Sequence, residues 1–261
     1  MRATDSRPDG SLAGELLRLL QAQRQFVQDA SHQLRTPITI ALGHAELLRE
    51  ELTGRQRHDL DVVIGELERL RTLSDRLLLI AACEHPDFLI LEPAELDVLA
   101  VDLVGRWERA APRHWQLGRL DQVTAPADAE RLAMALDALI ENAVKHTGPE
   151  DIIKLTVSRD TGDKFAHIVV EDTGEGIADA DMPHVFERFR TMSGAGSRGT
   201  GLGLALVEAI ARGHGGHAQV SSRLGFGSCF ELLLPAEPAD DVVNCILVPQ
   251  VRRYQEQNGA S

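Results

Sequence analysis

Four short segments carry residue types that could do chemistry, and the first holds His32 and Thr36 ahead of Pro37. If Val27 and Leu34 occupy the a positions of a heptad, His32 takes the f position, which faces water, and Thr36 follows one turn later on the same side. A lone exposed histidine is usually a solvated surface residue. The proline, however, costs a helix interior ~3 kcal/mol, and a helix that keeps this defect beside an exposed histidine favours a functional bend.

The second and third segments place polar groups at the end of a helix and at the end of a strand. In Leu139–Gly148, the amide oxygen of Asn142 could hold Mg²⁺, and the ammonium group of Lys145 could meet a phosphate. In Val170–Ile177, Asp172 follows a strand and leads into spaced glycines, so its carboxylate would face a cavity that the backbone can approach closely. Each segment alone also fits a plain helix stop or a plain turn.

The fourth segment, Gly199–Gly203, runs spaced glycines directly into a helix. Free N–H groups in that arrangement form an anion-binding nest, which the helix dipole reinforces. The segment has neither the Gly-Lys-Ser/Thr of a Walker A loop nor the GxGxxG of a dinucleotide-binding fold, so both are excluded. Before it, Phe186, Phe189 and Arg190 precede a glycine- and serine-rich run, which is typical of a mobile lid with an aromatic anchor.

Two amphipathic helices must position His32. The first apolar seam predicts a helix of about 38 residues, which is too long to be stable without packing partners. Thr53-Gly54 interrupts it, and a second seam follows. Because two such helices bury only part of their apolar surface, we predict an antiparallel hairpin that dimerises into a four-helix bundle; the alternative docks the hairpin on the second half of the chain. The seams comprise Leu20, Val27, Ala30, Leu34, Ile38, Ala41, Ala45 and Leu48, then Leu60, Val63, Leu67, Leu70, Leu77 and Ala81.

The second half reads as a mixed α/β domain of roughly 145 residues, so the fold class of the whole chain is α+β. After Pro235 the tail is polar, with one apolar patch at Val242–Val248 to which we assign no role. Within the domain we expect helices at Glu95–Ala110 and Asp128–Lys145, and strands at Ile152–Val157, Phe165–Glu171, His217–Ser221 and Ser228–Leu234.

Composition excludes several classes of function. The 261 residues include 27 Lys+Arg and 40 Asp+Glu, a formal net charge of −13, which argues against a generic surface for nucleic acid or anionic membrane. No apolar run approaches the ~18 residues of a spanning helix, and the first residues lack the apolar stretch of a signal peptide. Three cysteines without a CxxC motif fit a reducing cytoplasm.

In this order and spacing, the four segments resemble those of the sensor histidine kinases of bacterial two-component systems. The resemblance implies that residues 15–83 form a dimerisation and phosphotransfer domain of the HisKA type. After a linker at 84–93, residues 94–235 would form an ATP-binding domain of the GHKL type, an α/β two-layer sandwich. A flexible N-terminus at 1–14 and the tail at 236–261 lie outside the two domains.

The resemblance also assigns roles. It implies that His32 is the phosphoacceptor, that Thr36 is the residue type that positions water for dephosphorylation of a partner, and that Asn142 binds Mg²⁺. Asp172 would read the adenine amino group, while Lys145 and Arg190 offset phosphate charge. The residues that would contact ATP are Asn142, Lys145, His146, Asp172, Gly174, Gly176, Phe186, Phe189, Gly199, Thr200, Gly201, Leu202 and Gly203.

The implied activity is Mg²⁺- and ATP-dependent autophosphorylation of His32, followed by transfer to an aspartate of a response regulator. The receiver domain of that regulator would dock on the exposed helix face near His32. The implied state is a homodimer without direct nucleic-acid contacts. We expect a cytoplasmic location, with attachment to a membrane sensor in a longer protein.

One residue departs from the family pattern. The family usually places Asp or Glu directly after the phosphoacceptor, whereas this chain has Gln33. An amide cannot take a proton, although its carbonyl can orient the imidazole. Since the reference pKa of histidine is ~6.5, roughly three-quarters of the imidazole is already neutral at pH 7. We therefore expect Gln33 to slow autophosphorylation without abolishing it.

Three alternatives remain from the sequence. Another GHKL-type ATPase is opposed by the segment around His32. A phosphatase-biased or pseudokinase scaffold gains support from Gln33, but the intact Asn142 and Asp172 oppose it. A metal site through His214 and His217 lacks a third ligand, so a glycine-rich turn is the favoured interpretation of that stretch.

Overall fold

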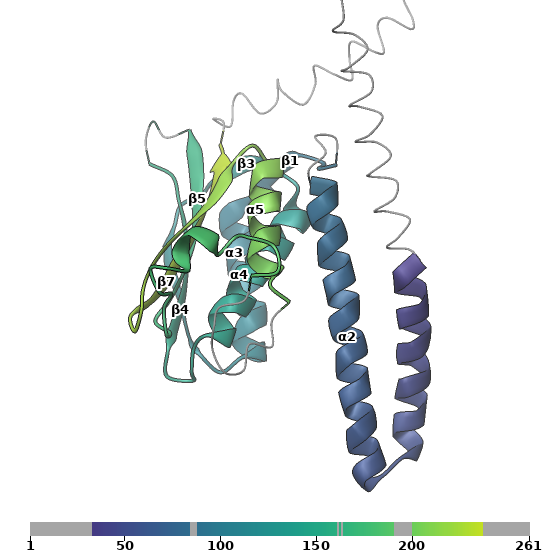
Figure 1. Cartoon of the computed structure of the whole chain (residues 1–261). Helices are drawn as coiled ribbons and strands as arrows, with labels where there is room; N and C mark the ends of the chain where they lie inside the picture. Colours follow the sequence, from purple (N-terminus) through teal and green to yellow (C-terminus); the bar gives the residue numbers. More distant parts are fainter. Residues whose placement is uncertain (1–32, 84–87, 161, 163, 191–199, 237–261) are drawn as a thin grey trace, which may run out of the picture. The chain divides into compact units, whose positions relative to one another are not determined.

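The computed structural model describes residues 33–83, 88–160, 162, 164–190 and 200–236 (Figure 1). The chain divides into two compact units, Met1–Ala82 and Cys83–Ser261.

The first unit is an antiparallel pair of helices (Figure 1). The first helix covers residues 33–51 of the described chain and continues across Pro37, and α2 spans Gly54–Cys83. Gly54 has a φ of +62°, a value that glycine adopts without a steric penalty. The predicted interruption at Thr53-Gly54 is confirmed, except that Gly54 already belongs to α2. Seam residues before residue 33 lie outside the described residues.

The core of the hairpin uses only part of the predicted seam. Leu42, Ala45 and Ile64 are buried, and Ile38, Leu60 and Leu67 pack against them. The predicted seam contained Ala41 and not Leu42. The apolar stripe that faces α2 runs through the next residue, Leu42, which is buried. Four seam leucines and valines are instead about half exposed in the single chain: Leu34 (52%), Leu48 (50%), Val63 (50%) and Leu70 (50%).

Two ion pairs between the helices hold the antiparallel register. Arg35 Nη2 lies 2.5 Å from Asp75 Oδ1, and Arg49 Nε lies 2.6 Å from Asp61 Oδ1. All four side chains are exposed by more than a third, so each pair contributes at most about 1 kcal/mol. Apolar burial therefore stabilises the hairpin, and the ion pairs select its alignment.

The second unit is a two-layer α/β sandwich. Its main sheet has the strand order β2-β4-β5-β7-β6, in which β2 and β4 are parallel and the other neighbours antiparallel. A separate antiparallel pair joins β1 to β3. The strands are β1 (Glu92–Glu95), β2 (His114–Leu120), β3 (Thr124–Ala127), β4 (Ile152–Ser158), β5 (Phe165–Asp172), β6 (His217–Arg223) and β7 (Gly227–Pro235).

Helices cover one face of the main sheet (Figure 1). They are α3 (Leu96–Ala110), α4 (Ala129–Lys145) and α5 (Gly203–Gly213), and a short 3₁₀ turn, η1, spans Met182–His184. Both helices and all four strands predicted from the sequence are confirmed, with ends shifted by at most two residues. The strands β1, β2 and β3 were not predicted, since β1 and β3 have four residues each and contain a proline.

Buried and partly exposed residues alternate along β4 and β5, and the buried ones form the core of the second unit. Every second residue of each strand is buried, and these side chains point to the face that α4 covers. Because each fully buried aliphatic side chain contributes roughly 1.5–3 kcal/mol, this layer fixes the orientation of α4 on the sheet. The buried residues include Ile153, Leu155, Val157, Ala166, Ile168 and Val170 on the strands and Leu132, Leu136 and Leu139 on α4.

A buried histidine joins the end of α5 to the start of α4. His214 is 4% exposed; its Nδ1 donates to the carbonyl of Ile210 (2.7 Å), and its Nε2 accepts from the backbone N–H of Asp128 (3.0 Å). Asp128 in turn caps α4 by accepting from the N–H of Arg131 (3.1 Å). Both ring nitrogens are therefore engaged, which argues against a metal site through His214 and His217. Within the described ranges, no group of three or more His, Cys, Asp or Glu side chains could hold a metal ion.

This arrangement predicts an acid-sensitive fold. Burial is the largest effect on His214 and lowers its pKa, against smaller opposing effects of Ile210 and Asp128. The unfolded chain therefore takes up a proton that the folded chain resists, so the free energy of unfolding falls as the pH drops below about 6.5. We expect His214→Gln, whose amide can make both hydrogen bonds but cannot titrate, to lose less stability between about pH 7 and pH 5 than the parent chain. Urea unfolding at each pH measures this, and a constant stability difference between the two proteins would contradict it.

Candidate functional site

The C-terminal end of α4 presents one amide, one ammonium group and one imidazole. Asn142 is partly buried one turn before the end of α4, Lys145 is the last helical residue and is exposed, and His146 is the C-cap residue. The backbone N–H of His146 donates to the carbonyls of Asn142 and Ala143, each at 3.2 Å. Since residues four apart share a helix face, Asn142 and His146 lie on the same side of α4.

The carboxylate of Asp172 stands at the end of β5 and is only 7% exposed. It accepts a hydrogen bond from the backbone N–H of Gly174 at 2.9 Å. Burial raises the pKa of Asp172, although hydrogen bonds from the N–H groups of Gly174 and Ser228 and the charge of His146 act to lower it, while Asp151 raises it. The site thus holds a desolvated acceptor ready for a donor group of a ligand.

Glycines let the segment after Asp172 come close to its surroundings. A Cβ atom on Gly174 would lie 2.1 Å from the carbonyl oxygen of His146, so only glycine fits there. Gly176 is buried, and a Cβ atom on it would lie 2.2 Å from the carbonyl oxygen of Arg223. The loop 173–176 is therefore clamped between the end of α4 and the hairpin that joins β6 to β7.

The aromatic segment before residue 191 is anchored on one side. Phe186 packs edge-on against the buried Phe230, with ring centroids 6.4 Å apart. Phe189 is 59% exposed and has a φ of +62°, and its N–H donates to the carbonyl of Gly201 at 2.9 Å. Arg190 forms an ion pair with Asp181 (3.2 Å); its predicted role near phosphates stays a prediction.

The segment that enters α5 contains a buried hydroxyl group without a partner. Among the described residues, Thr200 Oγ1 is the buried side-chain polar atom that makes no hydrogen bond. Leu202 is fully buried and is the N-cap residue of α5, where its side chain caps no N–H group, and Gly203 begins the helix. The first turn of α5 therefore offers uncapped N–H groups to an anion.

The other predicted site residues belong to the first unit or fall outside the described chain. Gln33 and Thr36 are exposed at the start of the described part of the first helix. His32 and Gly199 lie outside the described residues.

Sequence reasoning missed two residues that organise this site. Arg113 Nη2 donates to the carbonyls of Val144 (2.9 Å) and Thr147 (2.8 Å), and so caps the C-terminal end of α4. Glu175 Oε1 is hydrogen-bonded to Nδ1 of His146. Arg113 lies 31 and 34 positions before the residues whose carbonyls it binds, so no local pattern marks it. Glu175 lies inside the predicted motif Val170–Ile177, but its partner His146 is 29 positions away in the sequence.

The residues present fit an adenine nucleotide with its metal ion. A buried carboxylate suits an exocyclic amino group, and the orphaned hydroxyl of Thr200 lacks the partner that a ligand would supply. An amide oxygen of Asn142 suits Mg²⁺, and the start of α5 suits phosphates.

Two family models match the chain. Residues 127–238 match the model described as "Histidine kinase-, DNA gyrase B-, and HSP90-like ATPase", and residues 22–85 match the "His Kinase A (phospho-acceptor) domain". Together they cover the segments around His32, Asn142, Asp172 and Gly201.

Curated relatives and solved structures agree with these matches. The probable sensor histidine kinase TcrY of Mycobacterium tuberculosis is 38% identical over 223 residues, which are 82% of this chain and 46% of TcrY. The sensor protein DivL of Caulobacter vibrioides is 33% identical over 246 residues, 89% of this chain and 31% of DivL. This chain thus spans less than half the length of these relatives.

Among solved structures, full-length ShkA in complex with AMPPNP superposes with a TM-score of 0.67 at 29% identity, covering 82% of this chain and 46% of ShkA. The histidine kinase AdeS of Acinetobacter baumannii has a TM-score of 0.58 at 24% identity, covering 79% and 98%. The likeness to AdeS concerns the fold alone.

The burial of Asp172 predicts opposite effects on stability and on binding. Because the folded state raises the pKa of Asp172 above its unfolded value of ~3.9, ionised Asp172 reduces stability once the pH rises through the folded pKa. We expect Asp172→Asn to weaken AMPPNP binding about 10- to 100-fold and to leave the nucleotide-free protein at least as stable as the parent at pH 7.

Asp151→Asn is the control, because the fold lowers the pKa of Asp151 and raises that of Asp172. Hydrogen bonds, first from the N–H of Gly148 and then from Thr173, lower the pKa of Asp151. Its ionised form therefore favours folding above its unfolded pKa, and the amide should destabilise the domain at pH 7. Calorimetric binding and thermal unfolding of both variants measure this; an Asp172→Asn variant that is destabilised like Asp151→Asn would contradict the interpretation.

Proposed function

The chain belongs to the sensor histidine kinases, and we propose that it transfers the γ-phosphoryl group of ATP to its own His32 and then to a response regulator. The observation that carries this proposal is the joint presence, in one chain, of a helical hairpin matched by the phosphoacceptor model and of an ATPase-type unit with a buried carboxylate, Asp172. The proposed division is 15–83 for dimerisation and phosphotransfer and 94–235 for ATP binding.

In the proposed complex, Asp172 accepts a hydrogen bond from the adenine amino group, and the nucleotide supplies the partner that the hydroxyl of Thr200 lacks. The triphosphate lies toward Asn142, Lys145 and the uncapped start of α5. Asn142 would hold Mg²⁺, which supplies charge neutralisation on the phosphates when bound. Lys145 adds a cation, and Arg190 is a second one if it leaves Asp181.

The phosphoryl transfer itself needs little covalent assistance from the protein. The neutral nitrogen of His32 attacks the γ-phosphorus, the new N–P bond forms as the bond to the β–γ bridging oxygen breaks, and ADP leaves with that electron pair. Such transfers pass through a loose transition state, so positioning and charge neutralisation account for most of the rate enhancement. Gln33 can orient the imidazole through its carbonyl but cannot receive its proton.

The half-exposed seam of the hairpin supports a homodimer. Leu34, Leu48, Val63 and Leu70 each expose about half of their surface in the single chain, and they belong to the two predicted seams. A second copy of the hairpin would cover them in a four-helix bundle. We therefore propose that the active form is dimeric.

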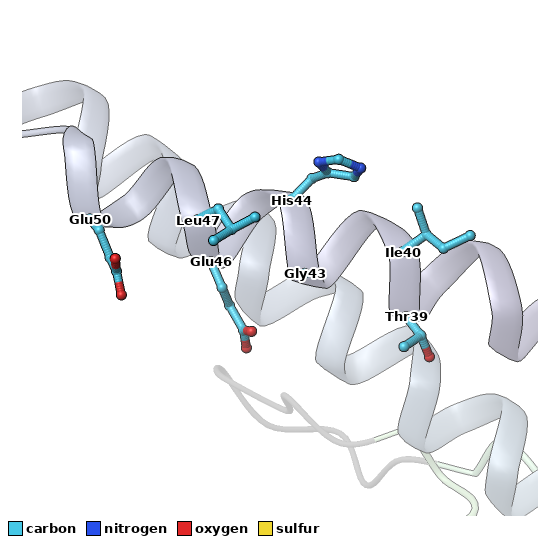
Figure 2. Close-up of a pocket in the computed structure, with 7 residues that line it drawn as sticks. All are labelled: Thr39, Ile40, Gly43, His44, Glu46, Leu47 and Glu50. Atoms are coloured by element: carbon cyan, nitrogen blue, oxygen red, sulfur yellow. The ribbon is translucent and has the colours of Figure 1, made fainter.

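A hollow on the first helix is the proposed docking place of the receiver domain. Figure 2 shows Ile40, His44 and Leu47 pointing to one side of Gly43, while Thr39, Glu46 and Glu50 point to the other. Ile40 and Leu47 are 56% and 66% exposed. The hollow begins seven residues after His32 in the sequence, so a regulator bound there would have its aspartate near the phosphoacceptor.

The proposed cellular setting is the output part of a membrane-attached sensor in the cytoplasm. The matched relatives are named sensor proteins and are more than twice as long as the matched region. In the part of the chain that the structure describes, no helix is both long and apolar enough to cross a bilayer.

Replacement of the phosphoacceptor tests the proposed reaction. We expect His32→Ala to bind ATP with unchanged affinity and to incorporate no acid-labile label from γ-labelled ATP, because the attacking nitrogen is lost. His44→Ala is the matched control, since His44 is an exposed histidine of the first helix and should leave labelling intact. Label retained by His32→Ala, or lost in His44→Ala, would refute the assignment; unlabelled parent protein would favour the scaffold or phosphatase alternative.

Restoring a carboxylate next to His32 tests the role of Gln33. General-base assistance typically contributes roughly 100- to 10,000-fold, so we expect Gln33→Glu to raise the single-turnover rate of autophosphorylation. Gln33→Ala should lower that rate, because it removes the orienting carbonyl. Rapid-quench measurement at saturating ATP separates these rates from binding. Equal rates for all three proteins would show that this position does not limit the chemistry.

A further inference from the structure

One side-chain pair at the candidate site has no part in the proposed mechanism. Glu175 Oε1 is hydrogen-bonded to Nδ1 of His146, between the loop after β5 and the end of α4. The backbone N–H of Glu175 also donates to the carbonyl of His146 at 3.2 Å. Two residues that are 29 positions apart in the chain are thus joined through both backbone and side chain.

This pair joins the end of α4 to the loop after β5, and the proposed nucleotide must contact both of these segments. On one side, His146 follows Asn142 by four residues on α4 and is tied to it by a backbone hydrogen bond of 3.2 Å. On the other side, Glu175 follows Asp172 by three residues, and the intervening Gly174 rests against the carbonyl of His146. The pair therefore sets the separation between the carboxylate of Asp172, which is proposed to bind adenine, and the amide of Asn142, which is proposed to bind Mg²⁺.

We propose that Glu175 is a positioning residue for nucleotide binding that acts through His146; this inference rests on the proposed ATP-dependent function. A carboxylate only accepts hydrogen bonds, so it fixes Nδ1 of His146 as the donor and fixes the ring plane. The His146 side chain is 20% exposed and that of Glu175 is 65% exposed. The largely shielded imidazole thus depends on Glu175 for its orientation, while Glu175 itself is exposed.

The exposure of Glu175 makes the test clean. Its side chain can be shortened without opening a cavity, and the backbone hydrogen bond to His146 remains. We expect Glu175→Ala to weaken Mg²⁺–AMPPNP binding roughly tenfold, the lower end of the loss seen when the partner that orients a metal-binding histidine is removed. Glu175→Gln retains an acceptor for Nδ1–H and should stay within about threefold of the parent.

A kinetic split distinguishes positioning from catalysis. Because Glu175 sets where the nucleotide binds and does not touch the transferred group, Glu175→Ala should raise the KM for ATP and leave kcat within about twofold. In a His146→Ala background, Glu175→Ala should have no further effect on the affinity for AMPPNP, since the residue through which it acts is gone.

Glu231→Ala is the matched control. His167 Nδ1 and Glu231 Oε1 form a second histidine–glutamate pair at 2.6 Å, between β5 and β7, and its loss should not change the affinity for AMPPNP. Equal affinities of Glu175→Ala and the parent, or additive losses in the double variant with His146→Ala, would overturn the inference alone. A parent protein that binds no Mg²⁺–AMPPNP would instead overturn the proposed function.

Discussion

The ATP-binding unit is organised around a carboxylate that is kept out of water. Asp172 is 7% exposed, and a desolvated carboxylate persists only where hydrogen-bond donors surround it. The register of β5 against β7 brings Ser228 opposite Asp172, and Gly174 supplies a second N–H. Since a Cβ atom at Gly174 would collide with the carbonyl of His146, the same glycine that satisfies the carboxylate also brings the end of α4 to the site. One acceptor thereby dictates a strand register, a loop and the position of a helix.

The helical hairpin obeys a different constraint, in which apolar surface is left uncovered. Leu42, Ala45 and Ile64 form the core of the described hairpin, and a half-exposed apolar stripe lies beside them. An apolar stripe of this kind is stable in water only when another surface covers it. The ATP-binding unit, by contrast, forms its own core between the main sheet and the helices α3, α4 and α5. The homodimer proposed above would cover this stripe, whereas the ATP-binding unit needs no second copy to complete its core.

The sequence predicts the features that depend on neighbouring residues and misses those that depend on contacts between residues far apart in the chain. Helix α4 and strands β4 and β5 carry periodic patterns within a few residues, and the glycines around Asp172 mark local backbone requirements, so these were predicted correctly. The stripe through Leu42 was missed because a heptad pattern does not say which of two neighbouring lines faces the partner helix. Arg113 and Glu175 were missed because their partners lie 29 to 34 residues away, and such pairings exist only after the sheet has formed.

A net charge of −13 is compatible with a site for a highly anionic nucleotide, because local geometry and not the total charge sets the potential there. Charges on exposed side chains more than about 10 Å away are screened by salt, so the potential at the site is set by nearby groups. In the proposed complex those groups would be Lys145, the N–H groups at the start of α5 and a Mg²⁺ ion on Asn142. Each of them is effective only at short range, which makes catalysis sensitive to small errors in their separation. A contact such as that between His146 and Glu175, which adds no positive charge of its own to the phosphates, can therefore matter as much as a cation.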